Sequence, residues 1–425
     1  MKRKILILLF SFPLFALACC KECEEPKPPK PPKPLSSTKL SVVWHIPFHS
    51  DVVEFYFLDP ILIQDYLILP SQFPPDGYTS GIGVFHKLTG KRHSAWQSEP
   101  GGTLDNNDDL EGCKLGGNQN NIIFIANYKS LYAFDVNTKQ RLWKSTRPLE
   151  YHFESNFSIL GGNPFVTCNL GDEKSKLIRF NAQTGRSEDI VQLYPESGYR
   201  ISIRPPAWHI RNNGDTLLFF SASGWNFGLG RTKIRVYCYN LTRREMVWEK
   251  TDFSTDNNGA GYVAPIITDE QNVIFMGLSS IHCFNIANGE LLWQHDLFQI
   301  ESFSMTPPLY DEGKIYLRGQ TGNVYCYDAI TGTELWSNKS LKATPTPDGR
   351  MDICDGNLYF TGRRVGDIGL YCLSAQTGEF KWFDTGPGGR VAFGVIADRQ
   401  LGYLYCTCGE FVTCIDLKKT PIQNK

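Results

Sequence analysis

This sequence has few long apolar runs and no block of charge of one sign. The 425-residue chain carries a formal net charge of −1, and it contains no long basic run. This balance argues against a nucleic-acid partner, because such partners are bound through clustered Lys and Arg. The one extended apolar run, Ile5 to Leu17, is shorter than the about 20 residues that a membrane-spanning helix needs.

Motifs of hydrolases, nucleotide-binding proteins and metalloproteases are also missing. The chain has no Gly-x-Ser-x-Gly, no phosphate-binding loop and no His-Glu-x-x-His. The alternating Asp105, Asn107 and Asp109 resemble part of a calcium loop, but its sixth-position Gly and distant Glu are absent. A solvated acidic loop is the favoured interpretation. We therefore predict no catalytic residue, no metal site and no cofactor.

A recurring eleven-residue segment is the dominant feature. Its clearest copy begins at Cys326, passes a Thr-Gly turn and ends at Trp336. Further copies run from Cys283 to Trp293, Cys372 to Trp382, Cys238 to Trp248 and Ala133 to Trp143, and two altered copies begin at Val84 and Arg179. The period of about 45 residues is typical of propellers and other repeat arrays.

Each copy predicts a strand, a tight turn and a second strand. Two further strands precede it, which gives four antiparallel strands per repeat, as in one propeller blade. The first position should be small, because two blades meet over it, and the tryptophan should pack between neighbouring blades. Seven residues occupy this structural tryptophan slot: Trp44, Trp96, Trp143, Trp248, Trp293, Trp336 and Trp382.

The two ends of the repeat indicate a closed ring. The last copy, at Cys414, reaches the end of the chain before its tryptophan, and Leu40 to Trp44 is a strand without a preceding copy. Pairing of these two strands removes the open sheet edge. The predicted fold is all-β, an eight-bladed β-propeller of four-stranded antiparallel blades over residues 39–418, monomeric, with a C-terminal tail at 419–425.

The repeat resembles the tryptophan motif of quinoprotein-type (PQQ-repeat) eight-bladed propellers. Arg243-Arg244 and Lys139 depart from its Thr-Gly, and the copy that begins at Arg179 lacks the tryptophan. We therefore expect blades 3 and 4 to be less regular. The resemblance also implies quinone-dependent dehydrogenases, which carry an adjacent Cys-Cys pair over the cofactor. The adjacent pair here, Cys19-Cys20, lies in the N-terminal segment, so no dehydrogenase site is transferred.

The N-terminus predicts an exported lipoprotein. Lys2 to Lys4 and the apolar run form a signal peptide over residues 1–18. Ala18 before Cys19 resembles a bacterial lipobox, with Cys20 as the alternative lipidated residue. Residues 19–38 include a Pro/Lys-rich tract that would form a stiff spacer of roughly 28 Å. The expected location is the bacterial outer membrane, on its periplasmic face or at the cell surface.

Thirteen cysteines in an exported chain raise the question of disulfides. The five at the small position should lie in separate layers between blades, too far apart to pair, and are predicted to be free thiols. Three cysteines lie in the N-terminal segment. The repeat does not assign five others, whose pairing the sequence leaves open: Cys113, Cys168, Cys354, Cys406 and Cys408.

One interval between repeats, from 179 to 238, is longer than the others. It contains the two tryptophans outside the slot, Trp208 and Trp225, and the latter is followed by Asn226 and Phe227 in a Gly-rich stretch. Aromatics in such an extension are typical of binding loops, so these four residues form the candidate partner or ligand loop.

In size, anchor and eightfold repeat, the chain is similar to propeller lipoproteins of the outer-membrane barrel-assembly machinery. This resemblance implies a non-catalytic scaffold that binds an envelope protein, such as a barrel-assembly component. A surface glycan-binding lipoprotein is the alternative, with sugars stacking on Trp208 and Trp225, and a PQQ-dependent dehydrogenase is the third hypothesis.

Overall fold

The computed structural model describes most of the region from residue 40 to residue 420. The described ranges are 40–47, 60–73, 79–91, 114–117, 120–126, 130–146, 152–170, 174–196, 199–226, 228, 231–251, 253, 259–268, 271–297, 307–341, 349–364, 367–387, 392–408 and 411–420. They belong to one compact unit, Leu35–Lys425. Within these ranges, no helix has the length and apolar character needed to cross a membrane.

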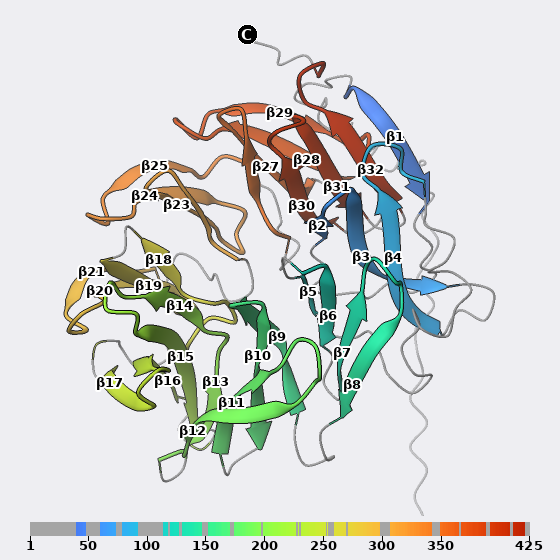
Figure 1. The fold of residues 1–425 in the computed structure, drawn as a ribbon. Coiled ribbons are helices and arrows are strands. Elements are labelled where there is room, and N and C mark those ends of the chain that lie inside the picture. Colours follow the sequence, from blue (N-terminus) through green and yellow to red (C-terminus); the bar gives the residue numbers. More distant parts are fainter. Residues whose placement is uncertain are drawn as a thin grey trace, which may run out of the picture. The chain divides into compact units, whose positions relative to one another are not determined.

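Eight antiparallel sheets follow one another around a ring (Figure 1). The first four blades are built from these strands: β2 (Ile61–Ile63), β3 (Tyr66–Phe73) and β4 (Thr79–His86); β5 (Lys114–Gly117), β6 (Ile122–Ala126), β7 (Ser130–Asp135) and β8 (Arg141–Thr146); β9 (His152–Leu160), β10 (Asn163–Leu170), β11 (Lys174–Phe180) and β12 (Ser187–Leu193); β13 (Arg200–Ile203), β14 (Ala207–Ile210), β15 (Thr216–Asn226), β16 (Arg231–Asn240) and β17 (Glu245–Lys250).

The other four blades have the same plan. Their strands are β18 (Ile266–Thr268), β19 (Asn272–Met276), β20 (Ser280–Asn285) and β21 (Leu291–Asp296); β22 (Leu309–Asp311), β23 (Lys314–Arg318), β24 (Val324–Asp328) and β25 (Glu334–Asn338); β26 (Asp352–Cys354), β27 (Asn357–Arg364), β28 (Asp367–Ser374) and β29 (Phe380–Asp384); β30 (Ala392–Asp398), β31 (Tyr403–Cys408), β32 (Phe411–Asp416) and β1 (Val42–Pro47). The predicted eight-bladed propeller is confirmed. Trp96 lies outside the described residues.

The turn inside each repeat forms for local reasons. In blade 6, the carboxylate of Asp328 accepts hydrogen bonds from the backbone N–H groups of Ile330 and Thr331. Gly332 then takes φ 72°, a left-handed conformation that glycine adopts without steric cost. We call this turn, between the third and outermost strands of each blade, the outer turn. The backbone bonds of the turn lower the pKa of the Asp328 carboxyl below its usual value.

The hydrophobic core is divided into eight clusters, one at each junction between neighbouring blades. The small-position cysteines fall in different clusters: Cys238 between blades 4 and 5, Cys283 between 5 and 6, Cys326 between 6 and 7, Cys372 between 7 and 8, and Cys414 between 8 and 1. All five are buried free thiols, as the sequence predicts.

The N-terminal strand closes the ring. β1 pairs antiparallel with β32, and Trp44 lies opposite Cys414. Ser41 donates from its backbone N–H to Thr420 Oγ1 at 3.1 Å, and its carbonyl accepts from Asp416 N–H at 2.8 Å. In blade 6, the carbonyl of Thr333 accepts the equivalent hydrogen bond from the backbone N–H of Asp328. The two chain ends therefore rebuild one outer turn in the same register as an uninterrupted blade.

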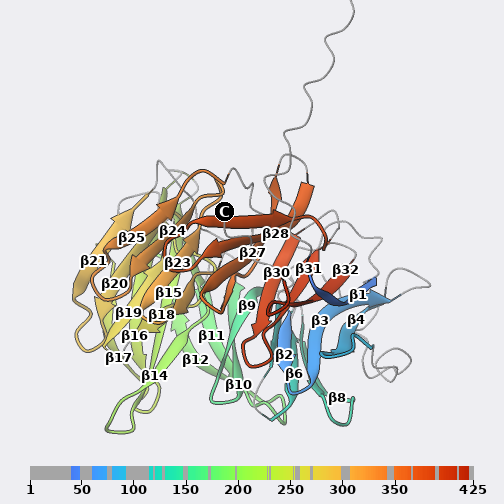
Figure 2. The same cartoon turned by 90° about the horizontal axis from the view of Figure 1, so that it is seen from above.

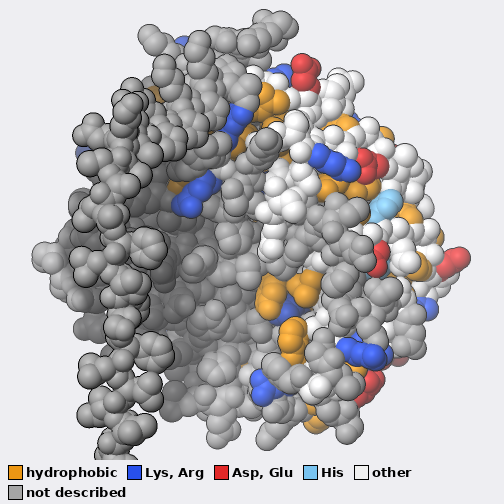
Figure 3. Space-filling view, turned by 180° about the vertical axis from the view of Figure 1, so that it is seen from behind, with side chains coloured by type: hydrophobic (Ala, Val, Ile, Leu, Met, Phe, Trp, Pro, Cys, Tyr) orange, Lys and Arg blue, Asp and Glu red, His pale blue; other side chains and the backbone are white. Residues whose placement is uncertain are grey.

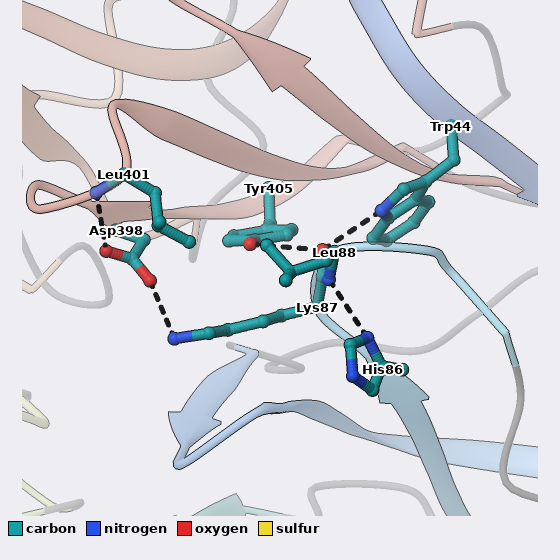
Figure 4. A network of polar contacts seen from close by, with 7 residues as sticks. All are labelled: Trp44, His86, Lys87, Leu88, Asp398, Leu401 and Tyr405. Carbon is teal, nitrogen blue, oxygen red and sulfur yellow. Dashed lines mark hydrogen bonds and ion pairs between the residues drawn. The ribbon is translucent and has the colours of Figure 1, made fainter.

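Blades 8 and 1 are joined by a polar network around Lys87 (Figure 4). Its carbonyl accepts from Trp44 Nε1 at 3.0 Å and from the Tyr405 hydroxyl at 3.2 Å. Its ammonium lies 2.9 Å from the Asp398 carboxylate, and both side chains are largely buried. Although burial alone opposes the change, hydrogen bonds from Lys87 and the Leu401 backbone N–H lower the pKa of Asp398. The closing strand is thus held by side-chain contacts as well as by the sheet.

The ring has two different ends. The outer turns and the short turns between the first two strands of each blade lie at one end, which we call the turn end. The connections between the second and third strands, and those between blades, lie at the other, which we call the loop end. Strands run between these ends across the thickness of the ring (Figure 2). Connections between blades such as Pro47 to Ile61 and Asp296 to Leu309 are longer than the turns.

Candidate functional site

The slot tryptophans join each blade to the next. Each indole Nε1 donates to a carbonyl in the following outer turn, at 2.8–3.1 Å: Trp44 to Lys87, Trp143 to Ala182, Trp248 to Ile286, Trp293 to Ile330 and Trp336 to Ala375. Each ring also covers the glycine of that turn closely. A Cβ added to the glycine would lie 2.3–2.7 Å from an indole carbon. Each of these indoles therefore takes part in a packing and hydrogen-bond contact between neighbouring blades.

Trp382 differs from the other slot tryptophans. It is fully buried among residues of blades 7 and 8, including Leu417. Its Nε1 has no hydrogen-bond partner among the described atoms. The outer turn of blade 8 is the one interrupted between Thr420 and Ser41. Thr420 occupies the position at which the other described turns carry glycine, Lys139 or Arg244.

The junction between blades 3 and 4 uses ion pairs in place of the tryptophan and glycine. The β-bulge of β12 lies opposite Leu177 and Ile178, and Arg179 is paired with Glu188 at the slot. Glu188 also contacts Arg244, which has φ 59° at the glycine position of the next turn. Both partners of the usual contact are therefore replaced together. This confirms the expected irregularity of blades 3 and 4.

A polar groove of about 500 Å³ lies on blade 3 beside these ion pairs. Seven residues line it: Asn163, Arg179, Asn181, Thr184, Arg186, Ser187 and Glu188. On the face of the molecule drawn in Figure 3, the described basic and acidic side chains are also interspersed. The groove offers hydrogen-bond donors and acceptors from these side chains.

Blade 4 accounts for the long interval in the repeat. Its first strand is divided into β13 and β14, with Pro205 and Pro206 between them, and both pieces pair with the eleven-residue β15. The backbone N–H of Arg204 donates a hydrogen bond to the backbone carbonyl of Ser221 at 2.8 Å, which keeps the two pieces in line. Ser221 to Asn226 therefore continue a strand. Trp225 and Asn226 are the last residues of β15, and Phe227 lies outside the described residues.

Trp208 and Trp225 lie at opposite ends of this blade. Trp208 pairs with Leu218, and both side chains lie on the sheet face that packs against blade 3. Trp225 lies on the same sheet face as Ser223. The Ser223 hydroxyl accepts a hydrogen bond from the backbone N–H of Ala260, in the segment that leads into blade 5. The seven-residue interval from Leu218 to Trp225 spans roughly 23 Å. The two rings are 36% and 41% exposed, so each is open to solvent, but the structure does not bring them together.

Two basic residues of blade 4 are nearly buried. The Arg204 guanidinium lies 3.9 Å from the Tyr262 ring centroid, which links blade 4 to the segment before β18. Arg235 pairs with Glu196 at 2.6 Å. Burial alone would lower the pKa of Arg235, but neighbouring Tyr237 and Glu196 raise it overall. These contacts stabilise the loop end of blade 4, where Trp225 is presented.

The buried thiols are chemically quiet. Burial raises the pKa of Cys238, Cys283, Cys326, Cys372 and Cys414 to about 12, and that of Cys354 to about 11. Because the thiolate is the nucleophile, these groups are not suited to covalent catalysis. Cys168, Cys354 and Cys406 are also buried. Cys113 and the side chain of Cys408 lie outside the described parts of the structure.

His282 is a buried titratable group of blade 5. It is 2% exposed in β20, and its Nε2 lies 2.6 Å from Ser280 Oγ. Burial lowers the pKa of His282 to about 4, from an ordinary value of about 6.5.

We therefore expect the ring to lose stability as pH falls from about 6.5 to about 4, because the unfolded chain takes up this proton before the folded one. Above that window His282 is neutral in both states, and below it the loss is constant at about 3 kcal/mol. Urea unfolding of wild type and His282→Gln across this range measures the effect. A pH profile that the substitution leaves unchanged would contradict the assignment.

Several predicted site residues lie outside the described ranges. These are Cys19, Cys20, Asp105, Asn107 and Asp109. Among the residues that are described, no group of three or more His, Cys, Asp or Glu side chains is arranged to hold a metal ion. The described residues also contain no adjacent cysteine pair, so they do not fit the quinone site that the dehydrogenase resemblance implies.

Comparisons with known proteins agree with this architecture. A family model described as outer membrane protein assembly factor BamB matches residues 277–410. Tetrathionate hydrolase from Acidithiobacillus ferrooxidans is 28% identical over 160 residues, 36% of this chain and 28% of that protein. Outer membrane protein assembly factor BamB from Kangiella koreensis is 26% identical over 157 residues, 34% of this chain and 37% of that protein. The matches thus span well under two thirds of these relatives.

Solved structures share the complete ring. BamB from Moraxella catarrhalis aligns with a TM-score of 0.59 and 14% identity, over 91% of this chain and 100% of that one. Quinohemoprotein alcohol dehydrogenase from Comamonas testosteroni aligns with a TM-score of 0.63 and 11% identity, over 91% of this chain and 78% of that one. At these identities the likeness concerns the fold alone.

Proposed function

We propose that this chain, a PQQ-repeat eight-bladed propeller similar to outer membrane protein assembly factor BamB, is a non-catalytic scaffold. It binds a protein partner in the cell envelope, in the assembly of outer-membrane proteins. The observation that carries the proposal is the family match over residues 277–410, which extends from blade 5 into blade 8. A curated relative of the same description supports it.

The scaffold is held at the membrane by an N-terminal lipid. The lipobox at Cys19, or alternatively Cys20, and the Pro/Lys-rich spacer support this part of the proposal. Anchoring places the protein on the outer membrane, at its periplasmic face or at the cell surface. A metabolic label with a fatty-acid analogue, lost in Cys19→Ala and retained in Cys20→Ala, would identify the lipidated residue.

The partner binds at the loop end around Trp225. Trp225 is exposed at the loop end of β15, and the neighbouring connections between blades are the long ones. An exposed indole on a rigid strand gives a large contact area at low entropic cost, and tryptophan is enriched among the residues that dominate binding energy. Asn226 and Phe227 follow Trp225 in the predicted loop. Asn226 is buried, and Phe227 lies outside the described residues.

We expect Trp225→Ala to reduce partner capture by about tenfold, because truncating an indole anchor removes most of its buried area. Trp208→Ala is the matched control, since it removes a similarly exposed indole at the other end of the blade. The measurement is cross-linking and affinity recovery of the full-length protein from native membranes, followed by identification of the recovered proteins by mass spectrometry.

The recovered molecules distinguish the proposed functions. Recovery of a barrel-assembly component with wild type and Trp208→Ala, but not with Trp225→Ala, supports the scaffold function. Equal capture by wild type and both variants contradicts the assigned face. Polysaccharide-uptake proteins or retained glycan would favour a glycan-binding lipoprotein, for which the two exposed indoles offer stacking surfaces. Stoichiometric quinone binding with alcohol or sugar oxidation would overturn a non-catalytic role.

A further inference from the structure

The outer turns differ in charge around the ring. In blades 8, 1, 2, 3 and 4 they present exposed cationic side chains, with Glu245 as the one exposed acidic side chain in these turns among the described residues. We call these cations the basic crescent: Lys418, Lys419, Lys91, Arg141, Arg186, Arg243 and Arg244. In blades 5, 6 and 7 the described outer turns present exposed Glu290, Glu334 and Glu379 and no exposed cation. The outer turns therefore form a basic side and an acidic side of the ring.

The crescent lies on one connected surface. Outer turns occupy the same end of every blade. Trp143 of blade 2 bonds the outer turn of blade 3, and blades 1 and 2 pack through one shared apolar cluster. Trp44 of blade 8 bonds the turn of blade 1, and Glu188 of blade 3 contacts Arg244 of blade 4. Lys419, Arg243 and Arg244 keep ion pairs with Asp416, Asp215 and Glu188, so their charge is partly offset.

The chain enters the ring inside this crescent. The hydrogen bond from Ser41 to Thr420 fixes the first described residues beside Lys418 and Lys419. The 39 residues before Leu40, which carry the predicted lipid site and the lysines of the spacer, are therefore joined to the ring at its basic side. Leu88, which is 43% exposed in the outer turn of blade 1, adds an apolar side chain to the same surface.

We propose that the basic crescent docks on the anionic phospholipid headgroups of the membrane to which the chain is tethered. Positive surfaces beside an anchor are attracted to anionic lipid, and exposed apolar side chains can enter the headgroup layer. The acidic turns of blades 5, 6 and 7 are repelled from the same surface, so the ring tilts with blades 8, 1, 2, 3 and 4 toward the membrane. The loop end with Trp225 then faces away and remains open to a partner. The inference rests on the proposed anchoring.

The test measures lysine accessibility in the full-length lipidated protein on vesicles. An amine-reactive reagent labels the protein on phosphatidylcholine vesicles and on vesicles that also contain phosphatidylglycerol, and peptide mass spectrometry gives a rate for each lysine. Lys91, Lys418 and Lys419 should react about fivefold more slowly on the anionic vesicles. Lys339, exposed at the loop end of blade 6, is the internal control and should keep its rate. About 0.5 M salt should abolish the difference.

A pair of variants with equal net charge sharpens the result. Lys91→Glu with Arg186→Glu should remove the protection of Lys418, whereas Arg231→Glu with Arg363→Glu, exposed at the loop end, should preserve it. Equal rates on both vesicle types, protection that survives salt, or protection of Lys339 would overturn docking by the crescent. Failure of the protein to float with phosphatidylcholine vesicles tests anchoring separately, and partner capture is measured independently of both.

Discussion

Gly378→Ala unfolds at a much lower urea concentration than wild type, whereas Gly356→Ala loses far less stability. Both glycines belong to blade 7 and both have φ 69°. A methyl group at Gly356 meets nothing within 4 Å, but at Gly378 it lies 2.3 Å from Trp336 Cε3. The first substitution therefore measures backbone strain alone, about 1–2 kcal/mol. The second adds displacement of the indole.

The additional cost at Gly378 has two parts. Overpacking contributes about 1–3 kcal/mol, and the hydrogen bond from Trp336 to Ala375 is weakened. Together with the backbone strain, the total loss of unfolding free energy is about 3–5 kcal/mol. Equilibrium urea unfolding of both variants gives the comparison, and tryptophan fluorescence reports the displaced ring. If the two alanine variants have the same free energy of unfolding, the tryptophan–glycine contact does not stabilise the junction as argued here.

Trp44→Ala opens the ring at its closure and costs about 3–5 kcal/mol of unfolding free energy. Trp44 is 8% exposed, donates to Lys87 and packs against Tyr405 with ring centroids 5.9 Å apart. Its loss leaves a cavity between blades 8 and 1. It also removes the principal apolar contact of β1, which pairs with β32 alone. The closing strand should therefore detach before the rest of the ring unfolds.

The measurement combines urea unfolding with limited proteolysis, and cleavage near residue 40 reports the detached strand. Val43→Ala is the control, since Val43 belongs to the same strand but is 40% exposed. It should change stability by about 0.5 kcal/mol or less. If protease cleaves Trp44→Ala near residue 40 no faster than it cleaves wild type, main-chain pairing alone is sufficient to close the ring.

The repeated segment predicted most of the architecture because each copy encodes the same local chemistry. A side chain such as Asp328 organises its own turn through contacts within three residues, and this information is entirely local. Strand alternation then places the small residue and the tryptophan on one face. The position of Trp44 without a preceding copy was enough to predict closure, and the structure confirms its pairing with Cys414.

The departures from the repeat could not be interpreted from the sequence in the same way. The missing tryptophan of blade 3 and Arg244 of blade 4 are separated by more than fifty residues, and only their approach through Glu188 shows that they compensate for one another. Likewise, Trp208 and Trp225 are close in sequence but lie at opposite ends of one long hairpin. Their distance follows from strand extension, which composition does not reveal.

The sequence by itself determined the number of blades, the turn chemistry and the way in which the ring closes, because these depend on contacts within one repeat or on its period. Only the tertiary structure decided which charges share a surface. The basic crescent collects side chains from positions 91 to 419, and they become neighbours because closure of a ring brings the first and last blades together. A surface assembled from all parts of a chain has no local pattern from which it could be read.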